Sequence, residues 1–299
     1  MAEVIRRPDW LPSELWPWPI RGVPTPSGRL AVTDTGAGPT LLLAHIGSWS
    51  LIWRDLVSEL STDFRVVTFD TPGVGLSERV PWRELSLGGA AAGITAVVEA
   101  LDLGRLTLVA HDLGGPAGLA AMAASPERVE GIVAMNTFGW RPDSRVLRGM
   151  LRLMGSAPMR ALDVTVRLLP RVSSSSVGAG RHWTGAERRA FRRGLDAGAV
   201  RAWHRHLGDA ARSDDLYDRV ARVLDGPLAD RPLLTVFGER NDPLHFQPRW
   251  RALFPNAVQQ VVPQGNHFPM ADDPAGVANW IRAWHRGAVA GDRFALATG

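Results

Sequence analysis

One stretch of the chain limits the possible folds more than any other. It is the sequence LTLVAHDLGGP at residues 106–116, followed by small residues from 117 to 124. Residues 106–110 are apolar or β-branched, which is typical of a buried parallel strand, and the Gly-Gly-Pro before the alanine-rich run indicates the start of a helix. Asp112 lies between the two. Small neighbours would let the chain turn sharply there and present the Asp112 side chain above the sheet.

A carboxylate at such a turn has a defined chemistry. It is ionised and nucleophilic at pH 7 without a base, and a helix N-terminus favours its negative charge. Its attack on an amide or ester would give an anhydride no more stable than the substrate. Attack on a tetrahedral carbon that carries a halide or an epoxide oxygen would instead give an alkyl ester on Asp112, which water must then cleave. The alternative interpretation is that Asp112 only caps the helix.

The rest of the chain alternates between strand and helix patterns. Further strands are predicted at residues 28–35, 40–44, 65–69, 131–136, 232–237 and 258–262. Residues 94–101 and 277–284 each place apolar side chains on one face of a helix. The pattern predicts an α/β fold with a mostly parallel central sheet flanked by helices, and ligands at the carboxyl ends of its strands.

The alternation stops between residues 139 and 228. This part is helical and rich in arginine. The sequence therefore predicts a helical cap at residues 139–228, inserted into a core made of residues 1–138 and 229–299.

Two further polar side chains follow predicted strands. Asp242 comes after the strand that ends at Phe237, and His267 after the strand that ends at Val262. Asp242 is expected to orient the imidazole of His267, which would deprotonate the water that attacks the Asp112 ester. Glu239 is an alternative acid. The oxyanion formed in that step needs N–H donors, and the expected ones are the backbone groups of Leu113 and Gly47, with Gly47 favoured over Ile46.

These features resemble the haloalkane dehalogenase branch of the α/β-hydrolases, whose relatives include epoxide hydrolases and fluoroacetate dehalogenases. The likeness covers nearly the whole predicted core and is weak only in the cap. The resemblance implies an α/β-hydrolase fold with Asp112 as nucleophile, His267 as base and Asp242 as acid. The segments that carry it are residues 7–12, 53–55, 70–77, 111–116, 136–140 and 265–268.

The residues at the positions that would stabilise a leaving group differ from those of all three related enzyme families. Dehalogenases of this type carry a tryptophan after the nucleophile and an asparagine in the oxyanion loop, but here Leu113 follows Asp112 and residues 45–49 contain no asparagine. Leu113 also replaces the arginine of the fluoroacetate enzymes. Epoxide hydrolases use cap tyrosines, and the single tyrosine, Tyr217, is expected at an exposed helix start. The side chains expected to line the substrate pocket are Ile46, Trp49, Trp140 and Trp183, where Trp49 or Trp183 could donate an indole N–H.

Composition excludes several other classes. There is no cysteine, so disulfides and thiolate metal sites are excluded, and no metal or cofactor is expected. The pI of about 10.8 reflects a chain whose strong bases are all arginine, and no recognition motif for nucleic acid accompanies them. No membrane span or signal peptide is expected, so the expected location is the cytoplasm. The oligomeric state is left open between monomer and homodimer.

The sequence thus predicts a cofactor-independent hydrolase that acts on a small apolar organic substrate through an Asp112 ester, most simply a haloalkane dehalogenase. Epoxide hydrolysis, a changed reaction on a biosynthetic intermediate and a non-catalytic binding protein are the alternatives.

Overall fold

The computed structural model describes residues 3–291. Its centre is a nine-stranded sheet with the strand order β1-β2-β3-β5-β4-β6-β7-β8-β9. The strands are β1 (Glu3–Val4), β2 (Arg21–Val23), β3 (Leu30–Thr35), β4 (Thr40–His45), β5 (Arg65–Phe69), β6 (Leu106–Asp112), β7 (Val129–Thr137), β8 (Leu233–Gly238) and β9 (Val258–Val262).

The sheet is mostly parallel, as the sequence predicts. Strands β4 to β9 pair in parallel, whereas β1, β2 and β3 form an antiparallel edge that joins β5. All seven strands predicted from sequence are present. The two missed strands, β1 and β2, have only two and three residues, too few to show an alternating pattern.

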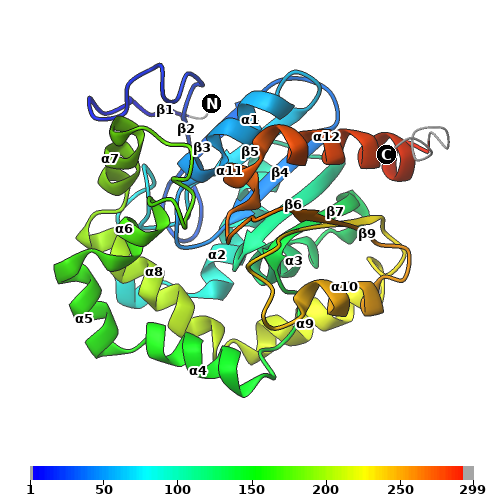
Figure 1. The fold of residues 1–299 in the computed structure, drawn as a ribbon. Helices are drawn as coiled ribbons and strands as arrows, with labels where there is room; N and C mark the ends of the chain where they lie inside the picture. The colour runs from blue at the N-terminus through cyan, green and yellow to red at the C-terminus, as the bar shows by residue number, and fades with distance from the viewer. Residues whose placement is uncertain (1–2, 292–299) are drawn as a thin grey trace.

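Helices cover both faces of the sheet (Figure 1). The α-helices are α1 (Arg54–Leu60), α2 (Leu87–Ala100), α3 (Gly114–Met122), α4 (Arg145–Met154), α5 (Ala157–Val166), α6 (Leu168–Ser173), α7 (Gly185–Gly194), α8 (Ala197–Ala210), α9 (Asp214–Leu224), α10 (Phe246–Leu253), α11 (Pro269–Asp272) and α12 (Pro274–Trp284). Helices α1, α11 and α12 pack together on one face, and α2, α3 and α9 pack on the other. Within residues 3–291, no helix is both long and apolar enough to cross a lipid bilayer.

The chain between β7 and β8 contains helices α4 to α9 and no strand. Helices α4 to α8 lie beyond the carboxyl ends of the central strands, whereas α9 packs against α3 on the sheet face (Figure 1). The last helix of the predicted cap range therefore contributes to the layer that covers the sheet.

The turn from β6 into α3 depends on close backbone packing. A Cβ added at Gly114 would lie 2.1 Å from the carbonyl oxygen of Ala44 in β4, and one added at Gly115 would lie 2.0 Å from Oγ1 of Thr137 in β7. Both distances are far below van der Waals contact. The two glycines therefore let α3 start directly against the sheet, which brings its N-terminus to the end of β6.

Candidate active site

Asp112 occupies a sharp turn at the end of β6. Its φ is +50°, a left-handed conformation that is rare for any residue other than glycine. The Thr137 hydroxyl donates to the backbone carbonyl of Asp112 and fixes this turn. The backbone N–H of Leu113 donates to the Asp112 carboxylate. The exposed fraction of the Asp112 side chain is 21%, so the side chain faces the cavity rather than the core.

His267 approaches the same carboxylate from the loop after β9. Its Nε2 lies 3.6 Å from Oδ2 of Asp112. Its backbone carbonyl accepts hydrogen bonds from Nδ2 of Asn136 (2.9 Å) and from Nε2 of His111 (2.6 Å). Asn136 also accepts a bond from the N–H of Gly238. The position of His267 is thus fixed through its backbone by strands β6, β7 and β8.

The pKa of the Asp112 carboxyl is lowered below its ordinary value. Burial alone would raise the pKa, but the imidazole of His267 and the N–H of Leu113 stabilise the charged form by more than burial disfavours it. Asp112 is therefore a carboxylate at neutral pH.

The structure does not join Asp242 to His267. The two carboxylate oxygens of Asp242 accept from the backbone N–H groups of Phe246 (2.6 Å) and Gln247 (3.0 Å), and so cap the start of α10. The side chain beside Nδ1 of His267 is instead the amide of Asn241, whose Nδ2 lies 3.2 Å away. The oxygen and nitrogen of a side-chain amide change places when the amide is flipped by 180°. In the flipped orientation, Oδ1 of Asn241 would accept a hydrogen bond from a protonated Nδ1 of His267. Asn241 thus occupies the place where Asp242 was expected.

A buried pair of histidines lies behind the nucleophile. Nδ1 of His45 is 2.8 Å from Nδ1 of His111, and the two rings stack. Burial lowers the pKa of His45 to about 3 and the pKa of His111 well below its usual range, so both rings are neutral. A carbonyl can only accept, so Nε2 of His111 carries the proton that bonds His267, and Nδ1 of His111 must accept from His45. Sequence analysis missed this pair.

A cavity of about 420 Å³ opens above Asp112 and His267. Its floor also contains Asn136, Asn241 and Asp242. The walls are almost entirely apolar and come from α4, α6, α8 and the loop before α10. The apolar lining residues are Phe138, Leu147, Met150, Leu151, Met154, Leu169, Val172, Val177, Trp203, Leu207, Pro243, Leu244, Phe246 and Phe268. Such a cavity suits an apolar molecule with one reactive centre.

None of the four predicted pocket residues lines this cavity. Ile46 is fully buried in the core. The indole N–H of Trp49 donates to the carbonyl of Phe191, and Trp140 stacks beneath the guanidinium of Arg249.

Trp183 packs against Phe191 and is also buried. Its Nε1 has no partner among the described residues, but it does not reach the cavity.

Trp203 is the tryptophan that lines the cavity. It lies on α8, and its indole edge covers Gly47, the predicted oxyanion residue. A Cβ at Gly47 would lie 2.2 Å from Cδ1 and 2.5 Å from Nε1 of this indole. Gly47 also has a φ of +93°. The six histidine and tryptophan positions between residues 140 and 210 carry no sequence signal for which side chain turns into the cavity.

Tyr217 does not lie at an exposed helix start as expected. Its side chain is buried, and its hydroxyl donates to the carbonyl of Ala210 at 2.9 Å. The single tyrosine of the chain is therefore outside the cavity lining and already has an acceptor.

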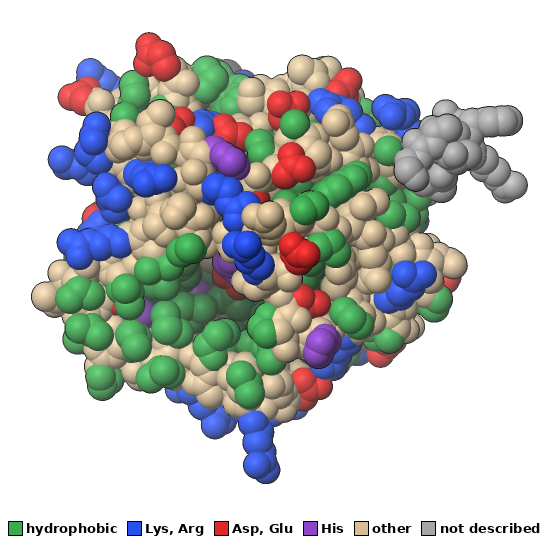
Figure 2. Space-filling view, viewed as in Figure 1, with side chains coloured by type: hydrophobic (Ala, Val, Ile, Leu, Met, Phe, Trp, Pro, Cys, Tyr) green, Lys and Arg blue, Asp and Glu red, His purple; other side chains and the backbone are tan. Residues whose placement is uncertain are grey.

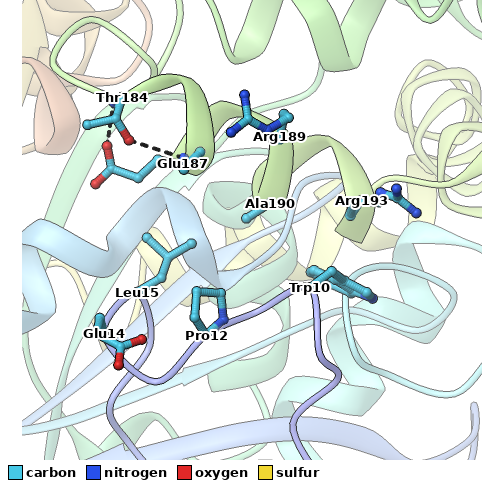
Figure 3. Close-up of a pocket in the computed structure, with 10 residues that line it drawn as sticks. Trp10, Pro12, Glu14, Leu15, Thr184, Glu187, Arg189, Ala190 and Arg193 are labelled. Carbon is cyan, nitrogen blue, oxygen red and sulfur yellow. Dashed lines mark hydrogen bonds between the residues drawn. The ribbon is translucent and has the colours of Figure 1, made fainter.

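A second cavity, of about 480 Å³, lies between the N-terminal segment and α7 (Figure 3). Trp10, Pro12 and Leu15 line one side of it, and Arg189, Ala190 and Arg193 of α7 line the other. This cavity contains neither Asp112 nor His267. The cavity above Asp112 is therefore the candidate active site.

The fold and the strand–turn–helix at Asp112 together define an α/β-hydrolase. The chain belongs to this family, because the family model described as alpha/beta hydrolase fold matches residues 39–274. It is related to haloalkane dehalogenases. Haloalkane dehalogenase 2 of Mycobacterium tuberculosis is 31% identical over 284 residues, which cover 90% of this chain and 96% of the relative.

Three other proteins are similar to this chain in sequence or in fold. A cis-3-alkyl-4-alkyloxetan-2-one decarboxylase of Xanthomonas campestris is 26% identical over 281 residues, covering 87% of this chain and 93% of the relative. A loop variant of haloalkane dehalogenase DbeA from Bradyrhizobium elkanii has a TM-score of 0.74 at 18% identity, covering 92% of this chain and 98% of that structure. Epoxide hydrolase CorEH has a TM-score of 0.72, also at 18% identity, covering 90% and 98%. The resemblance inferred from sequence is confirmed.

Proposed function

We propose that the protein is a haloalkane dehalogenase-like hydrolase in which Asp112 is the nucleophile. The observation that carries the proposal is the Asp112 carboxylate itself, which lies at the floor of an apolar cavity 3.6 Å from Nε2 of His267. The family relationship to haloalkane dehalogenase 2 supports the same chemistry.

In the first half-reaction, a carboxylate oxygen of Asp112 attacks the tetrahedral carbon that carries the halogen. The new carbon–oxygen bond forms as the carbon–halogen bond breaks, and the halide leaves with the electron pair. The product is an alkyl ester on Asp112. We assign the stabilisation of the halide to the indole N–H of Trp203, which lines the cavity against Gly47.

In the second half-reaction, Nε2 of His267 takes a proton from water, and the hydroxide attacks the ester carbonyl. The negative charge develops on a former carboxylate oxygen of Asp112, to which the N–H of Leu113 already donates. Collapse of the intermediate breaks the bond between the carbonyl carbon and the alkoxide oxygen, and the alkoxide takes the proton from the imidazolium of His267 to leave as the alcohol. The Asp112 carboxyl then releases its proton to solvent and is a carboxylate again. Asn241 orients the base through Nδ1. Helices α4 to α8, which lie beyond the carboxyl ends of the strands, act as the cap, and no cofactor takes part.

The test is the intact mass of a His267→Phe variant after incubation with a set of bromoalkanes. A stable mass gain of one alkyl group, mapped to Asp112, is expected, together with one equivalent of bromide. An Asp112→Asn variant should show neither. Absence of the adduct in folded His267→Phe protein, with no bromide released by the wild type, would contradict the proposal.

A second candidate function is favoured by Asn241. An amide beside Nδ1 stabilises a protonated His267 less than a carboxylate would, which disfavours ester hydrolysis. A cis-dialkyl oxetan-2-one, as named for the Xanthomonas relative, needs no water. Asp112 would attack the ring carbon that bears the ring oxygen and free a carboxylate. Loss of that carboxylate as CO₂ would then form the alkene and expel Asp112.

The two functions differ in their use of water. With an oxetan-2-one substrate, decarboxylation gives an alkene and CO₂ with no oxygen taken up from H₂¹⁸O. Dehalogenation places one solvent oxygen in the alcohol. Epoxide hydrolysis is disfavoured, because the hydroxyl of Tyr217 donates to Ala210 rather than into the cavity.

A further inference from the structure

Helices α4, α5 and α6 expose an unusual number of large apolar side chains. Figure 2 shows hydrophobic side chains gathered around a hollow over these helices. We call this surface, with the adjoining Val177, the α4–α6 face. Its exposed large apolar residues are Val146, Met150, Leu153, Leu162, Val166, Leu168, Val172 and Val177. Elsewhere in residues 3–291, large hydrophobic side chains are exposed only singly, at Val4, Leu253 and Val261.

Helix α5 has the reverse of the usual polarity of a surface helix. Its one buried residue is Asp163, whose carboxylate bonds Nε2 of His204 (2.7 Å) and the N–H of Leu169 (3.0 Å). Its exposed residues are Ala157, Pro158, Ala161, Leu162, Thr165 and Val166, and none of them is charged. A water-facing helix normally places its charges on that side. The exposed side of α5 is therefore suited to an apolar environment.

The α4–α6 face is continuous with the candidate active site. Met150, Val172 and Val177 are exposed and also line the cavity above Asp112. An apolar molecule lying against this face could therefore enter the cavity without crossing a polar rim at these three positions.

The net charge of the α4–α6 face indicates which kind of surface it can bind. Residues 145–177, which contain this face, have six arginines and one acidic residue, Asp163. The Asp163 carboxylate is buried and already bonds Nε2 of His204. Two copies of such a surface would repel each other, whereas an anionic apolar surface would be attracted. A lipid bilayer with anionic headgroups combines both properties.

We propose that the α4–α6 face docks on the surface of a membrane that contains anionic lipids, with Leu162 and Val166 entering the headgroup boundary. Docking would place the mouth of the cavity against the lipid, so that an apolar substrate dissolved there reaches Asp112. The docking rests on the surface of α4–α6 alone and is independent of the chemistry proposed for Asp112.

The experiment is cosedimentation of the full chain with two kinds of vesicle, phosphatidylcholine alone and phosphatidylcholine mixed with phosphatidylglycerol. Binding to the mixed vesicles is expected, weaker at high salt, with little binding to phosphatidylcholine alone. A Leu162→Gln/Val166→Gln variant should bind about tenfold more weakly or worse. The matched control is Leu253→Gln/Val261→Gln, which removes two exposed apolar side chains elsewhere and should bind like the wild type.

Circular dichroism of both variants verifies that they are folded, because all four positions are exposed. Lack of binding to the mixed vesicles by the wild type would overturn the proposal, as would equal loss in the two variants. Sedimentation velocity tests the alternative that a second copy of the chain covers this face, because it measures whether the protein is a dimer. The face would be assigned to a second copy if the wild type is a dimer that does not bind vesicles and the Leu162→Gln/Val166→Gln variant is a monomer.

Discussion

The side-chain amide of Asn241 lies 3.2 Å from Nδ1 of His267, where a carboxylate would stabilise a protonated imidazole. The neighbouring carboxylate of Asp242 does not bond His267 and instead accepts two backbone N–H bonds at the start of α10. The base of the proposed ester hydrolysis is therefore oriented but weakly supported electrostatically. This arrangement separates the roles of two adjacent residues, and each role can be tested.

An Asn241→Asp variant should cleave the Asp112 ester faster than the wild type, by about tenfold or more, because a carboxylate stabilises the imidazolium that forms during hydrolysis. Single-turnover mass spectrometry with a bromoalkane measures the decay of the ester. Asn241→Ala should slow the same step. Unchanged decay in both variants would show that Asn241 does not act on His267.

Asp242→Ala should lower stability rather than activity. Two backbone N–H groups lose their acceptor, so the free energy of unfolding should fall by about 1–2 kcal/mol, which urea titration measures. Formation and decay of the ester should stay within a few-fold of the wild type. Accumulation of the ester at unchanged stability would instead give Asp242 the acid role that the sequence predicts.

The order of strands and helices could be predicted because buried parallel strands are short, continuous apolar runs and each is followed by a turn former. The position of Asp112 followed for the same reason, since Gly114 and Gly115 mark the place where α3 meets the sheet. His267 could be found from its place directly after β9. These features depend on local sequence and on the geometry common to all parallel sheets.

The direction of individual side chains could not be predicted. Asn241 and Asp242 are adjacent, and only the turn between β8 and α10 decides which of them faces His267. Similarly, Trp203 rather than Trp49 or Trp183 lines the cavity, because the rotation of α8 is set by packing against distant helices. Judged by residue type alone, Asp242 is a better partner for His267 than Asn241. In the structure, however, the Asp242 carboxylate accepts a hydrogen bond from the backbone N–H of Phe246 at the start of α10.

The pH dependence of ester formation should reflect the lowered pKa of Asp112. In the wild type, the burst of halide release should stay constant as the pH falls through about 4, the ordinary value for aspartate. In His267→Phe the imidazole that contributes most to lowering the pKa of Asp112 is removed, and burial, which raises this pKa, remains. The inflection of alkylation, measured by intact mass, should therefore move to higher pH. Identical profiles for the two proteins would show that His267 does not act on the Asp112 carboxyl.

Trp203→Phe should slow halide release by about tenfold to a hundredfold, because the ring is kept but one N–H donor to the departing anion is lost. The matched control is Trp49→Phe. Its N–H donates to the carbonyl of Phe191 outside the cavity, so this change should lower the melting temperature and leave the alkylation rate near that of the wild type. Equal alkylation rates in the two variants would remove Trp203 from the proposed chemistry.

Gly47→Ala should be among the most damaging single methyl additions near the site. The new Cβ would lie 2.2 Å from Cδ1 of Trp203, and the φ of +93° at this position is strained for any L-residue. We expect the indole to move off the oxyanion loop, with a shift in tryptophan fluorescence, a lower melting temperature and slower ester formation. Gly104→Ala is the control, because nothing lies within 4 Å of its added Cβ. If both variants alkylate and melt like the wild type, the contact between Gly47 and Trp203 does not hold the site together.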